Sequence, residues 1–312
     1  MKIIAAPLQG YTEAPWRRFH AEVYGSGVDT YCAPFVRAEH GLIRPRDLRD
    51  TTSPTPEATA QIICRDAEEF RLLADALTRE SITRIDLNLG CPFQPQVKHG
   101  RGAGLAADPE RLAGVLRAMA DYPGVCFSAK MRLDHWQINL PLLENSPVRS
   151  LTVHARLHTQ QYSGDCRLEE FAAIAEATRL PLTYNGNILS PADFNLIADR
   201  FPFLEGIMIG RGLLARPSLA AEIKDARQWS AADRMDAIFR LHDKLLAHFE
   251  TTLCGPAQIL SKIKPYWDYL EPEIGHKSAK QIRKSTTLPA YCAALRAIPT
   301  ISGAEMRKID GF

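Results

Sequence analysis

The residues of this chain most able to do chemistry lie in one short segment, Arg84-Ile-Asp-Leu-Asn-Leu-Gly-Cys-Pro92. Its apolar residues alternate with Asp86 and Asn88, which predicts a β-strand with one apolar and one polar face. The Gly-Cys-Pro sequence then ends the strand and places Cys91 on a loop. The segment therefore brings a thiol close to two polar side chains at one end of a strand.

Three roles are open for Cys91: a small buried residue in a turn, a nucleophile or a proton donor. The polar loop that follows, from Gln94 to Gly102, favours an accessible thiol over a packed one. A nucleophile needs a neighbouring base, for which His99 is the candidate near in sequence. A proton donor needs only reach and a thiol that stays protonated, as free cysteine does below a pKa of about 8.5.

This strand is one of a series of short β-rich runs that alternate with helical patterns over three quarters of the chain. Strand order cannot be read from such a pattern, so a doubly wound sheet and a closed barrel both remain possible. Eight βα units in about 225 residues favour a (β/α)₈ TIM barrel, whose active site forms where the strands end. The predicted strands are Lys2–Ala6, Val28–Val36, Ala58–Ile63, Arg84–Leu89, Val125–Met131, Ser150–His154, Leu182–Asn185 and Gly206–Ile209.

Past Arg227 the strand patterns stop and helical spacing continues, which predicts a smaller all-α domain after the barrel. We place the barrel domain at residues 1–228 and the helical domain at 229–312. In the second domain, Lys277, Lys280 and Lys284 fall at i, i+3 and i+7, so in a helix they share one face. A solvated charged face is the simpler explanation of such a cluster, and contact with a polyanion is the alternative.

Composition sets further limits on function. The chain has 38 Lys and Arg against 36 Asp and Glu, and a net charge of +2 implies no nucleic-acid or membrane partner by itself. Seven cysteines at uneven spacing argue against a disulfide framework and a metal site, and for a reducing compartment. The sequence shows no signal peptide and no membrane-spanning stretch, so we expect a cytoplasmic protein that acts as a monomer.

Seven motifs in one order resemble those of the tRNA-dihydrouridine synthases, flavoproteins that reduce uridine in tRNA. The segment around Cys91, followed by Gly102-Ala103-Gly104-Leu105, is similar to the family's signature. The resemblance covers about residues 1–220 and, weakly, the helical domain. The other motifs are Ala6-Pro7-Leu8-Gln9-Gly10, Gln61, Ala129-Lys130-Met131-Arg132, Val153-His154-Ala155-Arg156, Asn185-Gly186-Asn187-Ile188 and Gly210-Arg211-Gly212.

The resemblance implies FMN as the cofactor and NADPH as the reductant. Turns after the last two strands would hold the flavin phosphate, and Lys130 would stabilise negative charge on the reduced ring. Alternatively, Lys130 is satisfied by a core carboxylate such as Asp86, and His154 is a core imidazole. The implied flavin-binding residues are Pro7, Leu8, Gln9, Gln61, Lys130, His154, Asn185, Gly186, Asn187, Gly210 and Arg211.

The resemblance also implies a mechanism. Hydride would pass from flavin N5 to C6 of a uracil extruded from the tRNA, while Cys91 protonates C5. Basic residues interleaved with Tyr266, Trp267 and Tyr269 would grip the tRNA, whereas Arg156 could equally form a surface ion pair. The implied substrate-contacting residues are Asn88, Arg156, Arg37, Lys262, Lys264, Lys277, Lys280, Arg283 and Lys284.

Several positions depart from the family pattern. Gln94 stands where the family usually carries Lys, and Pro34, Ala155 and Asn187 also differ. Phe35-Val36-Arg37 resembles the subfamily that acts on position 16 of the tRNA D-loop. Two rival functions stay open: an FMN barrel that reduces a small molecule, and a tRNA-binding protein whose catalysis has decayed.

Overall fold

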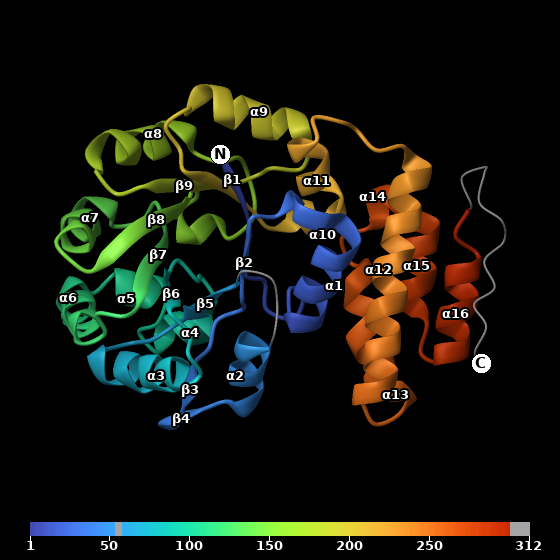
Figure 1. Ribbon diagram of the computed structural model, residues 1–312, viewed down its shortest axis with the longest axis horizontal. Helices are drawn as coiled ribbons and strands as arrows, with labels where there is room; N and C mark the ends of the chain where they lie inside the picture. Colours follow the sequence, from blue (N-terminus) through green and yellow to red (C-terminus); the bar gives the residue numbers. More distant parts are fainter. Residues whose placement is uncertain (54–57, 300–312) are drawn as a thin grey trace.

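The computed structural model describes residues 1–53 and 58–299, and its centre is a closed barrel of eight parallel strands (Figure 1). Going round the barrel, the order is β1-β10-β9-β8-β7-β6-β5-β2. This closed order confirms the TIM barrel and excludes the doubly wound sheet. The strands are β1 (Lys2–Ala5), β2 (Thr30–Cys32), β5 (Ala58–Ile62), β6 (Arg84–Leu89), β7 (Cys126–Arg132), β8 (Val148–His154), β9 (Leu182–Asn185) and β10 (Gly206–Ile209).

Helices follow the strands and cover the outside of the barrel (Figure 1). Asp66 caps α3, and its side chain accepts a hydrogen bond from the Glu69 N–H at 2.9 Å. The longer helices of this layer are α1 (Ala14–Tyr24), α3 (Ala67–Arg79), α6 (Pro109–Ala118), α7 (Trp136–Glu144), α8 (Leu168–Ala177) and α9 (Pro191–Arg200). The shorter ones are α4 (Gln94–Lys98), α5 (Ala103–Ala106), α10 (Arg211–Ala215) and α11 (Leu219–Lys224), with 3₁₀ turns at Gly25–Gly27, Met119–Asp121 and His158–Gln160.

One predicted strand, Val28–Val36, is much too long. Only β2 (Thr30–Cys32) is a strand, because Pro34 has no N–H to donate to the ladder. Val36 rejoins the barrel through a single bridge to Ile62. The chain then forms a short antiparallel pair, β3 (Ala38–Glu39) and β4 (Leu42–Ile43), and helix α2 (Pro45–Thr52), none of which the sequence pattern predicts.

Strand β6 has the two faces that its alternation predicts. Ile85, Leu87 and Leu89 are buried among apolar residues of the core. On the other face, Asp86 stands beside Ser128 of β7, and Asn88 beside Lys130. The parallel register therefore gathers polar side chains of neighbouring strands inside one end of the barrel, which is called the mouth below.

Five further helices lie on one side of the barrel, and the first of them packs against α1 (Figure 1). The first of them starts directly after Ser230, whose hydroxyl accepts a hydrogen bond from the Asp233 N–H at 3.1 Å. The domain limits given above stay predictions. The helices are α12 (Ala231–Thr252), α13 (Pro256–Ile263), α14 (Glu271–Ile274), α15 (His276–Lys284) and α16 (Leu288–Arg296), with a 3₁₀ turn at Lys264–Trp267.

Ion pairs fasten these helices to the barrel. Lys244 of α12 pairs with Glu22 of α1 at 3.0 Å, and Lys262 of α13 pairs with Glu13 at 2.6 Å. Within residues 1–53 and 58–299 no helix combines the length and the apolarity that crossing a bilayer requires. All seven cysteines are free thiols.

Candidate active site

The turn that carries Cys91 is held from several sides. The side-chain oxygen of Asn88 accepts hydrogen bonds from the Gly90 N–H at 3.0 Å and the Cys91 N–H at 2.9 Å. Arg132 Nε donates to the Gly90 carbonyl at 2.9 Å. Gly102, with φ +59°, packs so closely on the turn that an added Cβ would lie 2.9 Å from the Cys91 Cβ. The backbone at Cys91 is therefore fixed.

The thiol of Cys91 is half-buried and protonated at neutral pH. Burial raises the pKa of Cys91, although a backbone hydrogen bond from Phe93 and the nearby charges of Arg132 and Lys130 act in the opposite direction. In the described part of the chain no hydrogen bond joins Cys91 to His99, so the nucleophile role lacks its base. Of the three roles open for this residue, proton donor fits the geometry best.

A chain of hydrogen bonds inside the barrel leads to this turn. Asp86 accepts from the Ser128 hydroxyl at 2.6 Å and from Gln61 Nε2 at 2.8 Å. The side-chain oxygen of Gln61 in turn accepts from Asn88 Nδ2 at 2.8 Å. These bonds fix the side-chain amides of Gln61 and Asn88, whose oxygens both accept hydrogen bonds within the protein. Each amide nitrogen keeps one N–H for another partner.

Lys130 is the cation of the mouth without a protein partner. Asp86, the carboxylate considered for it, is occupied by Ser128 and Gln61, and no hydrogen bond or ion pair to Lys130 is made within the described residues. Burial and, to a smaller extent, the charge of Arg132 lower the pKa of Lys130 to about 8, although Asp86 acts in the opposite direction. A lysine without a counter-charge favours an anionic ligand, since the anion stabilises the charged form of the lysine.

His154 and Arg156 lie inside the protein. Arg156 is 1% exposed, so the surface ion pair considered for it is wrong. Its guanidinium donates to His154 Nε2 at 3.2 Å and to the Gly164 carbonyl at 2.6 Å. Because an arginine only donates, Nε2 is an acceptor and His154 carries its proton on Nδ1. Burial and four neighbouring cations lower the pKa of His154, which keeps the imidazole neutral. For Arg156 to contact the substrate, the loop after β8, which includes Gly164, would have to move away from its side chain.

The turns after β9 and β10 lie next to each other. Arg211 donates to Asn187 Oδ1 at 3.2 Å, and its guanidinium lies 5.2 Å from the centroid of the Tyr162 ring. Asn185 Nδ2 donates to the Met208 carbonyl at 2.8 Å and so joins the two strands. The remaining N–H groups of Arg211 and the backbone of these turns suit a phosphate group.

Two glycines of these turns lie in very close contact with other groups of the protein. A Cβ on Gly186 would lie 2.1 Å from the Tyr184 hydroxyl, and one on Gly212 would lie 2.0 Å from the Ile188 carbonyl oxygen. Gly210 has less crowded surroundings, with Ala6 as the nearest neighbour of an added Cβ at 3.4 Å. Only a bare backbone fits at the first two positions.

The loop after β1 borders the mouth. The Leu8 N–H donates to the Thr12 hydroxyl at 2.8 Å, and Gln9 Nε2 donates to the Phe35 carbonyl at 3.0 Å. Pro7 is half-buried, and Gln9 is exposed. Arg37, on the loop after β2, pairs with Glu39 at 3.0 Å. These residues lie where the strands end, as the motif spacing predicts.

The predicted basic and aromatic residues of the C-terminal helices divide into two groups. Lys262 and Lys264 are bound within the protein: Lys262 pairs with Glu13, and Lys264 donates to the Arg283 and Ser285 carbonyls, both at 2.8 Å. Of the interleaved aromatic rings, Trp267 belongs to the core, since it is 2% exposed, whereas Tyr266 and Tyr269 are half-buried. The expectation that these rings lie between cations on a binding surface is wrong for Trp267, because its indole packs inside the helices.

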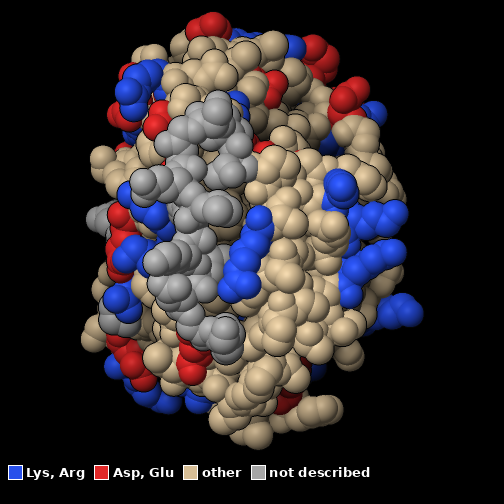
Figure 2. All heavy atoms as spheres, turned by 90° about the vertical axis from the view of Figure 1, so that its right-hand side faces the viewer, with Lys and Arg blue, Asp and Glu red and all other residues tan. Residues whose placement is uncertain are grey.

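The second group is exposed. Lys277, Lys280, Arg283 and Lys284 project from α15, whose apolar residues face inward, and Arg283 pairs with Glu271 at 3.0 Å. Figure 2 shows blue side chains gathered along one edge of this side of the molecule with little red among them. Segment 277–296 contains no acidic residue. This exposed face of α15 has the charge that a polyanion requires.

Sequence reasoning missed two residues of the mouth. Arg132 supports the Cys91 turn, and its guanidinium also lies 5.5 Å from the centroid of the half-exposed Tyr162 ring. A signal for Arg132 was present, because it follows Lys130 by two residues and so shares its strand face. Tyr162 lies in a loop without regular spacing, and no pattern marks it. Among the described residues no group of three or more His, Cys, Asp or Glu could hold a metal ion.

Comparison with solved structures reveals the same barrel. A variant of NCR from Zymomonas mobilis aligns with a TM-score of 0.52 at 12% identity, covering 73% of this chain and 88% of that one. TcOYE with pHBA aligns with a TM-score of 0.51 at 9% identity, covering 73% and 90%. At these identities the likeness shows the fold alone.

Sequence comparison defines the class. A mouth with a half-buried thiol and a lysine that has no protein partner among the described residues suits an oxidoreductase with a bound cofactor. The family described as dihydrouridine synthase (Dus) matches residues 3–284. The chain belongs to the dihydrouridine synthase family. This confirms the resemblance found in the motifs.

Two relatives illustrate the similarity. The tRNA-dihydrouridine(16) synthase of Ralstonia nicotianae is 31% identical over 251 residues, which cover 74% of this chain and 76% of that protein. The tRNA-dihydrouridine(16) synthase of Neisseria meningitidis serogroup B is 30% identical over 241 residues, which cover 72% and 71%.

Proposed function

We propose that this enzyme reduces the C5=C6 bond of a D-loop uridine in tRNA to dihydrouridine, with bound FMN and with NADPH as the reductant, in the cytoplasm. The observation that carries this proposal is the fixed turn of Cys91, whose half-buried thiol has a raised pKa and feels the charge of Lys130. A positioned acid that stays protonated is what addition of a proton to C5 requires.

The residues of the mouth fit the flavin. Lys130 lacks a protein counter-charge, so it would compensate the negative charge of the ring, and the Gly186 turn with Arg211 would hold the phosphate. Gln61 and Asn88 each keep one amide N–H for a ligand. When bound and reduced, FMN supplies a hydride to C6 of the uracil.

The protein's own contribution to the step is at C5. Cys91 gives its proton to C5, and the thiolate that results lies within the influence of Arg132 and Lys130, both of which stabilise it. Asn88 keeps the thiol in place through the Cys91 N–H. A proton from solvent then restores the thiol before the next turnover.

The target base has to leave the tRNA fold to enter the mouth, and the exposed face of α15 is positioned to hold the rest of the molecule. Lys277, Lys280 and Lys284 are the exposed cations that we assign to tRNA. Two relatives are named for position 16, which supports that nucleotide as the target. The subfamily-like segment at Arg37 points the same way.

The rival functions make different demands. A barrel that reduces a small molecule does not explain the basic helix α15, which contains no acidic residue. A decayed tRNA binder has no use for a fixed, protonated Cys91 or for an uncompensated Lys130. Both rivals are therefore less well supported.

The test has two stages. The purified protein should be yellow and contain FMN, and NADPH should bleach it. Mapping of dihydrouridine in tRNA from a strain without this gene should then reveal the loss of one D-loop position, restored by the wild-type gene. Colourless protein that takes up no FMN would support the decayed binder, and unchanged tRNA would support a small-molecule substrate.

A further inference from the structure

The loop after β6 exposes an aromatic ring two residues beyond Cys91. Phe93 is 60% exposed, and among the described residues it has neither an aromatic ring nor a cation packed on it. Tyr162, which is also exposed at the mouth, has the guanidinium of Arg132 at 5.5 Å and that of Arg211 at 5.2 Å from its ring centroid. The Phe93 ring is thus available to a ligand, whereas the Tyr162 ring already has partners in the protein.

The backbone of Phe93 is fixed on both sides. Its carbonyl oxygen accepts hydrogen bonds from the Gln96 N–H at 2.9 Å and the Val97 N–H at 3.1 Å, where α4 begins. Its own N–H donates to the sulfur of Cys91. The Cys91 carbonyl in turn accepts from the Ala103 N–H at 3.2 Å. The ring is therefore attached to the same rigid turn as the thiol, and a ligand that binds it has little backbone to order.

The short distance between the ring and the thiol determines which part of a substrate can reach the ring. Two residues of chain span at most about 7 Å, so the Cα atoms of Cys91 and Phe93 lie within that distance of each other. In an RNA whose uracil contacts the sulfur, the neighbouring nucleotides are one phosphodiester link away. These neighbours are therefore brought close to Phe93. An apolar residue elsewhere on the surface would have no such relation to the reacting atom.

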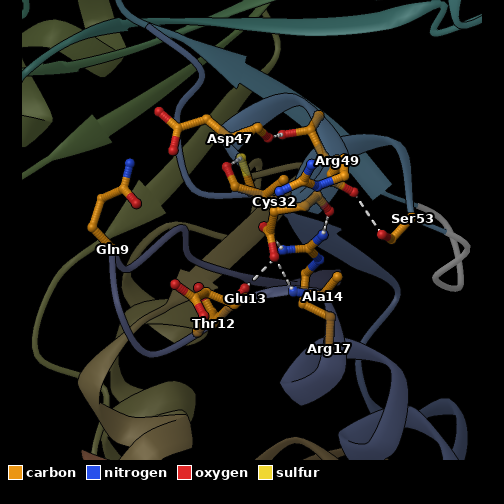
Figure 3. Close-up of polar contacts among 12 residues, drawn as sticks. Gln9, Thr12, Glu13, Ala14, Arg17, Cys32, Asp47, Arg49 and Ser53 are labelled. Carbon is orange, nitrogen blue, oxygen red and sulfur yellow. Dashed lines mark hydrogen bonds and ion pairs between the residues drawn. The ribbon is translucent and has the colours of Figure 1, made fainter. Parts of the chain in front are cut away.

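The side of the mouth formed by the loops after β1 and β2 offers no comparable surface. Asp50 of α2 accepts hydrogen bonds from the Ala14 N–H at 2.6 Å and from Arg17 at 3.0 Å, and these contacts tie α2 to the start of α1 (Figure 3). The phenyl ring on this side, Phe35, is 8% exposed and presents no face to a base. The loop after β6 is the side of the mouth that presents an unpartnered phenyl ring.

A free aromatic face beside the thiol suits the chemistry of base extrusion. A uridine that leaves its strand unstacks from its neighbours, which is unfavourable. Proteins that bind single-stranded nucleic acid offer aromatic side chains on which such bases stack instead. Because every base has a π-face, this contact accepts any of the four bases.

We propose that the ring of Phe93 stacks on a nucleobase directly next to the uridine that is reduced, and so compensates for the stacking that the strand loses. The inference rests on the proposed function, because it requires an RNA substrate. It makes Phe93 a residue that contacts the substrate without touching the reacting base. The contact depends on the presence of the flanking base and not on its identity.

The experiment uses the flavin-loaded full-length enzyme and transcripts of the tRNA whose reduced uridine has been mapped. Phe93→Ala should lower kcat/KM for dihydrouridine formation about 5- to 150-fold, the range expected when a base loses an aromatic stacking partner. Phe93→Trp should keep the wild-type value, whereas Phe93→Leu, an apolar side chain without a π-face, should lose most of it.

The matched control is Phe203→Ala. It removes a phenyl ring that is also 60% exposed but precedes β10, at the end of the barrel opposite the mouth. This variant should reduce tRNA as the wild type does. FMN content and the rate of bleaching by NADPH check that each variant is folded and loaded.

Transcripts with an abasic nucleotide on one or the other side of the uridine separate stacking from support of the thiol. One of them should lower kcat/KM of the wild type by a factor similar to that of Phe93→Ala, and should cause little further loss in Phe93→Ala. A Phe93→Ala enzyme that loses the same factor with parent and with both abasic transcripts would show support of the Cys91 turn, and would overturn the stacking proposal.

Two other results would also decide the question. A Phe93→Ala enzyme with the wild-type kcat/KM would overturn the stacking proposal and leave the proposed function intact. A wild-type enzyme that forms no dihydrouridine in any tRNA would remove the proposed function, and this inference with it.

Discussion

The side-chain oxygen of Asn88 accepts the N–H of Cys91 at 2.9 Å, so the last polar side chain of β6 fixes the residue that we propose as the proton donor. The same oxygen accepts the Gly90 N–H, and the amide nitrogen donates to Gln61. Asn88 therefore acts as a positioning residue for Cys91, in addition to the uracil contact predicted for it.

Replacement of Asn88 tests that relationship. Asn88→Ala leaves two backbone N–H groups without their acceptor, and we expect kcat to fall about 100-fold, as a displacement of about 1 Å in a reacting group does. If Asn88 only bound uracil, the change would appear in KM instead. Steady-state kinetics with tRNA separates the two. Ser128→Ala removes a more distant bond of the same chain and should cost less than tenfold.

Removal of the thiol should separate the two halves of the reaction. Cys91→Ala should keep FMN and its bleaching by NADPH, and dihydrouridine formation should fall about 100- to 10,000-fold, the usual contribution of a general acid. Stopped-flow absorbance measures the first half, and mass spectrometry of tRNA nucleosides the second. Cys126→Ala, on an exposed cysteine at the far end of β7, should be indistinguishable from the wild type. A Cys91→Ala enzyme with full tRNA activity would contradict the assignment.

The charge of Lys130 should be visible in the binding of reduced flavin. In the flavin-free protein its pKa is about 8, so below pH 8 the cation is already present. As the pH rises above 8 the lysine loses its proton, and binding an anion then requires proton uptake, so the affinity for reduced FMN should fall. Anaerobic titration at pH 7 and pH 9.5 measures this difference. In Lys130→Met the pH dependence should disappear, whereas Lys98→Met, on an exposed lysine of α4, should keep it.

The exposed face of α15 should determine the salt dependence of tRNA binding. In Lys277→Ala/Lys280→Ala, affinity should fall, and the slope of log Kd against log salt should decrease by about 1 for each lysine that meets a phosphate. Filter binding at several salt concentrations measures the slope. Lys2→Ala, at the start of β1 and thus at the end of the barrel opposite the mouth, is the control. An unchanged slope in the double variant would place the tRNA elsewhere.

Much of the fold could be read from the sequence, because its strands carry their own periodicity. The bounds of β6, β9 and β10 are those predicted, and the count of βα units favours the barrel that is observed. The prediction of one strand over Val28–Val36 was wrong, because a pattern of alternating residues does not show that Pro34 lacks the N–H that a strand needs. The segment with β3, β4 and α2 was missed, because elements of two to eight residues carry little periodicity.

The site could be predicted only as a set of residues. Cys91, Lys130 and Gln61 lie at the mouth as the motifs imply, but the hydrogen bonds that occupy Gln61 and Asn88 join two strands and leave no trace in local spacing. The burial of Arg156 and of Trp267 likewise depends on contacts with distant segments. The types and order of the residues were sufficient to predict the kind of chemistry. The hydrogen-bond partners and the burial of each side chain could be seen only in the folded chain.

Glu13 accepts a hydrogen bond from Lys262 of α13 at 2.6 Å and also pairs with Arg46 of α2. One carboxylate therefore connects the start of α1 to two helices that are distant in the sequence. The C-terminal helices are thereby held in a fixed position relative to the mouth of the barrel. Under the proposed function, the distance between α15 and the mouth is therefore fixed. For a tRNA bound at α15, this distance determines which nucleotide of the strand reaches the mouth and is reduced.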